Sequence, residues 1–277
     1  MAKFFGFVQF DFAGTLPLAD GRYLASSAEG GDETVLVLQR LGAPPHAERR
    51  RRRGRNSTPA DPEPAPLSLT RTTAIRAASP FEDQAQAARW LDEACEADDS
   101  AEALATEAIA ILNRALHAQA VAAADPYGRQ LTLEQAERVL LGYGSGEETA
   151  DGQFTDASQV DLTPRTASRR RQREEELRPQ ERVAAILRGR EQLDASETLL
   201  LRARADLDAG RNREAALQLR IGLEALLAEL DSAVKDPGHE EDMATLREHQ
   251  VAEQGPPVEE TLRICERVLR RRRVLHG

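Results

Sequence analysis

The sequence predicts an α+β fold, in which a small antiparallel sheet with packed helices is followed by an all-α helical module. Apolar and polar residues alternate near the N-terminus, which is typical of strands. From residue 79 onward apolar residues recur at helical spacing. We therefore expect an α+β domain over residues 1–162, a linker over 163–179 and a helical bundle or hairpin module over 180–277.

The predicted sheet begins with a strand over residues 4–12. Successive side chains of a strand point to opposite faces, so one face carries Phe4, Val8, Phe10 and Phe12. The opposite face carries Gln9 and Asp11. Further strands are predicted over 22–25, 34–38 and 67–75, and the run 34–38 is apolar on both faces, which favours a central position. Their connections are too short for helical crossovers, so antiparallel pairing is expected.

The charge of −10 is unevenly distributed along the chain. Residues 80–162 hold 17 acidic and 4 basic side chains, so the acidity belongs to the middle of the chain. Residues 42–66 are rich in proline and arginine and poor in apolar residues, which predicts a disordered loop. Arginine supplies 35 of the 37 basic residues, a bias typical of a GC-rich gene.

Helix starts and a glycine-rich turn are predicted in the middle of the chain. Ser79, Pro80 and Glu82 form a capping box with proline at the first helical position. Residues 142–146 read GYGSG and invite a phosphate-loop interpretation, but the acidic residues 147–148 that follow would repel phosphate. A glycine-rich hairpin turn is the better interpretation.

Both cysteines lie on apolar helical stripes. Cys95 is on the stripe of the helix that follows Ser79, and Cys265 is on that of the last helix. No CxxC motif or histidine pair accompanies either cysteine, so we expect buried, reduced thiols and no metal site. No cofactor motif is recognised either.

The C-terminal part is predicted to be helical throughout. Asp194 and Glu197 are expected to cap a helix that ends at a tight turn at Gly210, and Pro237-Gly238 is expected to break the chain. The sequence from Ala195 to Leu230 resembles a single tetratricopeptide-type helical hairpin, without a second copy.

A lone hairpin also suits a helical bundle such as the HEPN domains. The RNase members of that family use an arginine and a histidine with four to six residues between them. Arg271 and His276 have this spacing, although they lie in an arginine run at the C-terminus, where the spacing arises easily by chance.

Arginine clusters are the candidate nucleic-acid-binding residues, because arginine runs bind phosphate backbones without sequence preference. The candidates are Arg49, Arg50, Arg51, Arg52, Arg53, Arg55, Arg169, Arg170 and Arg171. The alternative is that these runs are solvated loops.

A candidate polar site is predicted on the helix that contains residues 113–117. Asn113 and His117 are one turn apart, off the main apolar stripe, and Arg114 is adjacent. With the acidic turn at Asp125 they could form a small-molecule pocket, although no nucleophile or metal spacing accompanies them.

Three function classes follow from these observations. A non-catalytic protein-interaction or scaffold protein is favoured, with a protein partner or self-association, because no catalytic constellation is present. A nucleic-acid-associated protein is the alternative, and an enzyme with a site near His117 is the third. The absence of an apolar run of membrane-spanning length and of an export signal predicts a cytoplasmic protein without a membrane partner. Stretches such as REAALQLRIGLEALLAEL resemble uncharacterised proteins of GC-rich actinobacteria, which implies a family but no function.

Overall fold

The computed structural model describes residues 3–26, 33–42, 68–96, 98–160, 180–229, 237–251 and 257–276. Contacts divide the chain into two units, Met1–Pro164 and Arg165–Gly277, which are described separately here. The predicted linker over 163–179 and residues 43–66 of the predicted loop lie outside the described residues.

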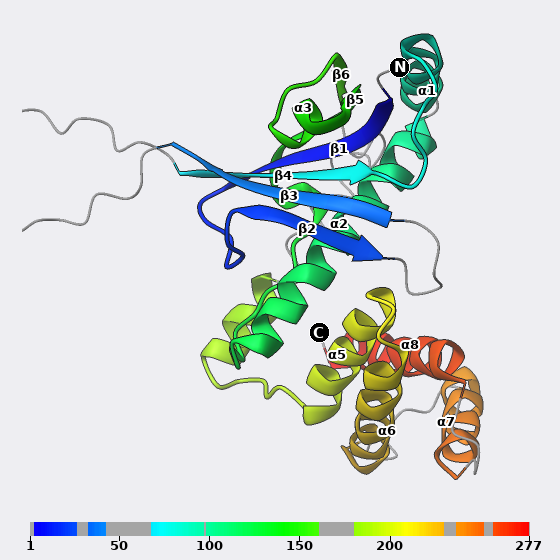
Figure 1. The fold of residues 1–277 in the computed structure, drawn as a ribbon. Coiled ribbons are helices and arrows are strands. Elements are labelled where there is room, and N and C mark those ends of the chain that lie inside the picture. The colour runs from blue at the N-terminus through cyan, green and yellow to red at the C-terminus, as the bar shows by residue number, and fades with distance from the viewer. Residues whose placement is uncertain are drawn as a thin grey trace, which may run out of the picture. The chain divides into compact units, whose positions relative to one another are not determined.

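The first unit contains a six-stranded antiparallel sheet in the order β2-β3-β4-β1-β5-β6 (Figure 1). The strands are β1 (Phe4–Ala13), β2 (Gly21–Ser26), β3 (Glu33–Leu41), β4 (Leu69–Arg76), β5 (Ala136–Ser145) and β6 (Asp156–Gln159). Every pairing is antiparallel, as the short connections predicted. β3 lies between two neighbours, in agreement with its apolar character on both faces. The predicted α+β fold with a helical module is therefore confirmed.

The main core lies between one face of the sheet and two helices, α1 (Gln84–Glu96) and α2 (Asp98–Ala122). The predicted face of β1 supplies Val8, Phe10 and Phe12 to this core, and each is at most 4% exposed. Opposite them pack Leu91 of α1 and Ala105, Ile109 and Leu112 of α2. Each large apolar side chain buried here contributes roughly 1.5–3 kcal/mol, so this layer accounts for much of the stability of the unit.

The other face of the sheet has a smaller core of its own. Phe7, Val37, Ile75 and Ala150 form a cluster there, and Phe154 packs on Phe7 with ring centroids 5.7 Å apart. Ala150 ends the short helix α3 (Gly146–Ala150), which contacts β5, β1 and β4. The chain thus folds back over this face after β5.

The start of α1 differs from the prediction. The helix begins at Gln84, and Phe81 instead forms an isolated bridge with Phe4 of β1. The cap comes from Asp83, whose Oδ1 accepts the Gln86 N–H at 2.7 Å. Backbone hydrogen bonds between Phe81 and Phe4, at 2.8 and 3.3 Å, hold this segment beside β1, and the Phe81 ring packs on Trp90. Tertiary contact therefore overrides the capping pattern read from the sequence.

The glycines at residues 142–146 do not form the predicted hairpin turn. Residues 142–145 end β5, a 3-10 turn (η1, Leu133–Gln135) precedes the strand, and α3 follows it. A Cβ atom at Gly142 would lie 2.6 Å from the Asp156 carbonyl oxygen and 2.7 Å from both the Ala157 Cβ and the Phe7 Cζ. Glycine is needed at this strand position because neighbouring backbone and an aromatic ring approach closely.

The second unit is entirely helical in its described part. A short helix over residues 180–187 is followed by α5 (Ala195–Asp208), α6 (Asn212–Glu229), α7 (Pro237–Gln250) and α8 (Val258–His276). Gly210 makes the predicted α5–α6 turn, with φ of 71° in the left-handed region that favours glycine. Gly222 of α6 lets the helices approach, since a Cβ there would lie 3.1 Å from Leu200 Cδ2.

One core joins the four longer helices of the second unit. Leu200 and Ala203 of α5 and Leu219, Leu223 and Leu226 of α6 pack with residues of α7 and α8, which include Met243, Leu246, Leu262, Cys265 and Val268. Arg204 of α5 also donates two hydrogen bonds to Glu266 of α8, at 2.8 and 3.1 Å. The α5–α6 hairpin is therefore part of a small bundle.

Two predicted helix ends of this unit are wrong in detail. Asp194 is the N-cap residue of α5, as predicted, but its side chain makes no capping hydrogen bond, and Glu229 of α6 instead accepts the N–H groups of Ala195 and Ser196. Pro237-Gly238 does not break the chain but forms the first turn of α7. Proline is well suited to a first helical turn, where its missing N–H has no partner to lose.

The close packing at Gly142 predicts that Gly142→Ala destabilises the first unit by about 1–3 kcal/mol, because the added methyl group must displace backbone or the Phe7 ring. Urea unfolding followed by the fluorescence of Trp90, the only tryptophan of the chain, reports on this unit. An unchanged unfolding midpoint would contradict the close approach of β6 to β5 at this position.

Candidate functional site

A buried carboxylate lies on the sheet face opposite α1 and α2. The strand registers align Gln39 of β3, Arg71 of β4, Asp11 of β1 and Arg138 of β5 in one row. Arg71 donates from Nε and Nη2 to the two Asp11 oxygens, over 2.8 and 3.1 Å. Arg138 approaches Asp11 Oδ2 with Nε at 3.0 Å and Nη2 at 2.8 Å. Two guanidinium groups therefore bind one carboxylate.

The electrostatics of this cluster keep Asp11 ionised. Burial alone would raise the pKa of Asp11, but the hydrogen bonds and charge of Arg71, together with those of Arg138, outweigh burial and lower that pKa. The stabilisation is therefore fully present above the pKa of an unfolded aspartate, about 3.9. It is lost as the pH falls through the lower pKa of the folded state.

A second buried polar side chain lies beside the cluster. Gln9 precedes Asp11 by two residues on the same strand face and is 2% exposed. Its Oε1 is buried and has no hydrogen-bond partner. An unpaired buried amide oxygen costs roughly 1–3 kcal/mol. Both residues of the polar face predicted for β1 are therefore buried, and one of them lacks a partner for its acceptor.

Sequence reasoning placed Asp11 on the polar face of β1, but it named neither Asp11 nor its partners as site residues. The alternation of β1 placed Gln9 and Asp11 on the same face. Arg71 and Arg138 are 60 and 127 residues away in the chain. Only strand register brings these side chains together, and a single sequence does not specify register between distant strands.

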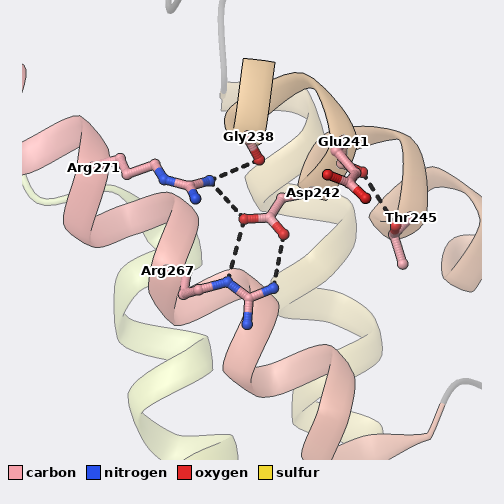
Figure 2. Close-up of polar contacts among 6 residues, drawn as sticks. All are labelled: Gly238, Glu241, Asp242, Thr245, Arg267 and Arg271. Atoms are coloured by element: carbon pink, nitrogen blue, oxygen red, sulfur yellow. Dashed lines mark hydrogen bonds and ion pairs between the residues drawn. The ribbon is translucent and has the colours of Figure 1, made fainter. Parts of the chain in front are cut away.

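A similar cluster joins α7 and α8 in the second unit, as Figure 2 shows. Arg267 binds both Asp242 oxygens, at 2.7 and 3.3 Å, and Arg271 Nη1 lies 2.6 Å from Asp242 Oδ2. The same Nη1 donates to the Gly238 carbonyl oxygen at 2.8 Å. The hydrogen bond from Arg267, with the charges of both arginines, lowers the pKa of Asp242 despite its burial. This cluster docks the first turns of α7 on the C-terminal half of α8.

The docking contact bears on the arginine–histidine spacing noted above. Arg271 is engaged by Asp242 and Gly238, and the side chain of His276 lies outside the described residues. Arg271 therefore has a structural role, because it holds α7 against α8. The RNase interpretation of the Arg271–His276 spacing stays a hypothesis from the sequence.

The structure shows what surrounds the candidate polar site on α2. The Asn113 amide donates to the Leu131 carbonyl oxygen at 2.8 Å and accepts the Leu131 N–H at 2.7 Å. Arg114 donates to the Ser26 carbonyl oxygen at 3.0 Å. His117 is exposed. Two of the three candidates therefore hold neighbouring backbone segments, and a catalytic role for them stays a prediction.

The candidate nucleic-acid-binding arginines at 49–53, 55 and 169–171 all lie outside the described residues. Their role stays a prediction. Within the described ranges, no group of three or more histidine, cysteine, aspartate or glutamate residues is arranged to hold a metal ion. In those same ranges, no helix combines the length and the apolar character that a bilayer crossing requires.

The outer surface of the helical unit exposes large apolar side chains. Leu217 and Ile221 are one turn apart on α6 and are 56% and 55% exposed. Val183 and Leu187 have the same spacing on the helix over residues 180–187, and both are exposed. Side chains four residues apart lie on one face of a helix, so each of these helices presents a short apolar stripe.

No protein-family model, curated protein or solved structure matches this chain.

The two cysteines differ in their environment, and the expectation that both are buried is wrong for Cys95. Cys95 is exposed near the end of α1, whereas Cys265 is fully buried in the core of the helical unit. Burial, with the neighbouring charge of Glu266, raises the pKa of the Cys265 thiol to about 12. The apolar stripe of α1 is thus centred on Leu91 and Ala94.

We expect one thiol of the native chain to react with a disulfide reagent at about pH 8, because only Cys95 is accessible and the Cys265 thiol is buried and protonated. The release of chromophore measures the number of reactive thiols. Cys95→Ser should abolish the native reaction, and denaturant should restore one equivalent from Cys265. Equal reaction rates for the two thiols in the native chain would contradict the packing of α8.

Proposed function

We propose that this chain is a non-catalytic protein-interaction protein, and that α6 of its helical unit contacts an amphipathic helix of a partner protein. The observation that carries the proposal is the exposed apolar stripe of Leu217 and Ile221 on α6. Apolar side chains spaced by one helical turn match the spacing of apolar residues on a partner helix.

The exposed stripe lies on a helix whose opposite side packs in the core of the helical unit. The opposite side of α6 carries Ala215, Leu219 and Leu223, which are at most 1% exposed. Packing against α5 through Gly222 holds the helix in place. A rigid helix loses little conformational entropy on binding, which favours affinity.

The distribution of exposed apolar residues also favours the helical unit. Among the described residues, the large apolar side chains that are strongly exposed in this unit are Val183, Leu187, Leu193, Leu201, Leu217, Ile221 and Val251. The larger first unit exposes four such residues in its described part. Single exposed apolar residues are normal, but a concentration of them on one unit supports a contact surface.

The proposed surface predicts that Leu217→Glu combined with Ile221→Glu abolishes partner binding, because two buried carboxylates would replace apolar contacts at the interface. Crosslinking in the host cell followed by affinity purification measures the bound partner. The double variant should recover it at least roughly tenfold less, in line with the loss of two apolar anchors.

A control is Val121→Glu, which places one glutamate at an exposed apolar position of α2 in the first unit. It should leave the recovered partner unchanged. Sedimentation equilibrium of the purified chain decides whether the partner is a second copy. Failure to recover any partner or any self-association, or equal recovery with the double variant, would contradict the proposal.

A further inference from the structure

We propose that the cluster of Arg71, Asp11 and Arg138 is a binding site for a small oxyanion, that is, a phosphate or carboxylate group of a ligand. Arg71 and Arg138 would contact the anion, and Asp11 acts as a positioning residue that holds both guanidinium groups. This inference concerns the sheet unit and is independent of the interaction surface on α6.

The charge balance of the cluster is the first argument. Two guanidinium groups, which remain protonated at all ordinary pH values, share a single carboxylate. Within the described part of the chain, neither Arg71 nor Arg138 has an ion pair with a second acidic residue. The cluster itself therefore carries one positive charge in excess.

The hydrogen-bond inventory is the second argument. A guanidinium group has five N–H donors arranged as a rigid fork. Arg71 and Arg138 both use Nε and Nη2 on Asp11. The Nη1 groups of both arginines have no hydrogen-bond partner among the described residues. Planar groups with such free donors bind the oxygens of phosphate and carboxylate well.

Accessibility and rigidity are the third argument. The side chain of Arg138 is 41% exposed and that of Arg71 is 20% exposed, while Asp11 is 7% exposed. The arginines lie on β4 and β5, the two strands that flank β1. Because Asp11 already fixes both side chains, an anion would bind without the full entropic cost of ordering them.

The residues around the cluster are polar on the same face. Gln39 of β3 is the register partner of Arg71 and is half-buried. Gln9 is buried beside Asp11 with an unpaired Oε1. Of these amide groups only the N–H donors can bind an anion, because the amide oxygens are acceptors. The Asp242 cluster of the second unit differs, because Arg271 also donates to the Gly238 carbonyl oxygen and ties two helices together.

We expect saturable binding of inorganic phosphate, of acetate or of both to the whole chain, monitored by the NMR signal of the Arg71 Nε–H group at constant ionic strength. Arg138→Gln should weaken binding roughly tenfold or more, the loss expected when a charged hydrogen-bond donor is removed. Arg138→Lys keeps the charge but loses the planar fork, and should also bind more weakly than the native chain. The relative affinity of the two anions identifies the chemical group.

Arg22→Gln is the matched control. Arg22 lies on β2 of the same sheet, its side chain is 44% exposed, and it is paired with Asp151 at 2.7 Å. This variant should leave anion binding unchanged. The melting temperature of each variant is measured to test whether the fold is retained. Absence of saturation with either anion, or equal affinity in Arg138→Gln, would overturn the proposal.

Discussion

The buried carboxylate of Asp11 sets the constraint on which the first unit depends. β1 is the strand that lies between β4 and β5, and Asp11 is a buried charge on it. A buried charge without its partners costs about 3–5 kcal/mol. Register shifts that separate Asp11 from Arg71 or Arg138 are therefore disfavoured, and the same contacts that fix the strands also create the proposed anion site.

The sequence predicts which segments form strands and helices better than it predicts the contacts between distant segments. Alternation over residues 4–12 places Phe10 and Phe12 in the core, and they lie there because the pattern depends only on neighbouring residues. The start of α1 is missed because Phe81 is held by Phe4, which is distant in sequence. The glycines of β5 are misread as a turn because the residues that crowd Gly142 come from β1 and β6. Local patterns therefore predict elements, whereas distant neighbours decide their ends.

The candidate site residues show that local sequence patterns also do not predict which distant groups a side chain contacts. Asn113 is a plausible ligand-binding residue by type and position, yet its amide hydrogen-bonds to the backbone at Leu131. Arg71 and Arg138 stand out only once strand register brings them to Asp11. In the helical unit, the exposure of Leu217 and Ile221 carries the proposed interaction. We thus propose a different role for each unit, an anion contact in the sheet and a protein contact on α6.

The most direct test of this account is the titration of the Asp11 carboxyl group by carbon-13 NMR of the intact chain. The account predicts a pKa below the usual value of about 3.9, because Arg71 and Arg138 stabilise the ionised form more than burial disfavours it. A pKa at or above the usual value would contradict it, since burial would then outweigh both arginines and the strand register would lack its central ion pair.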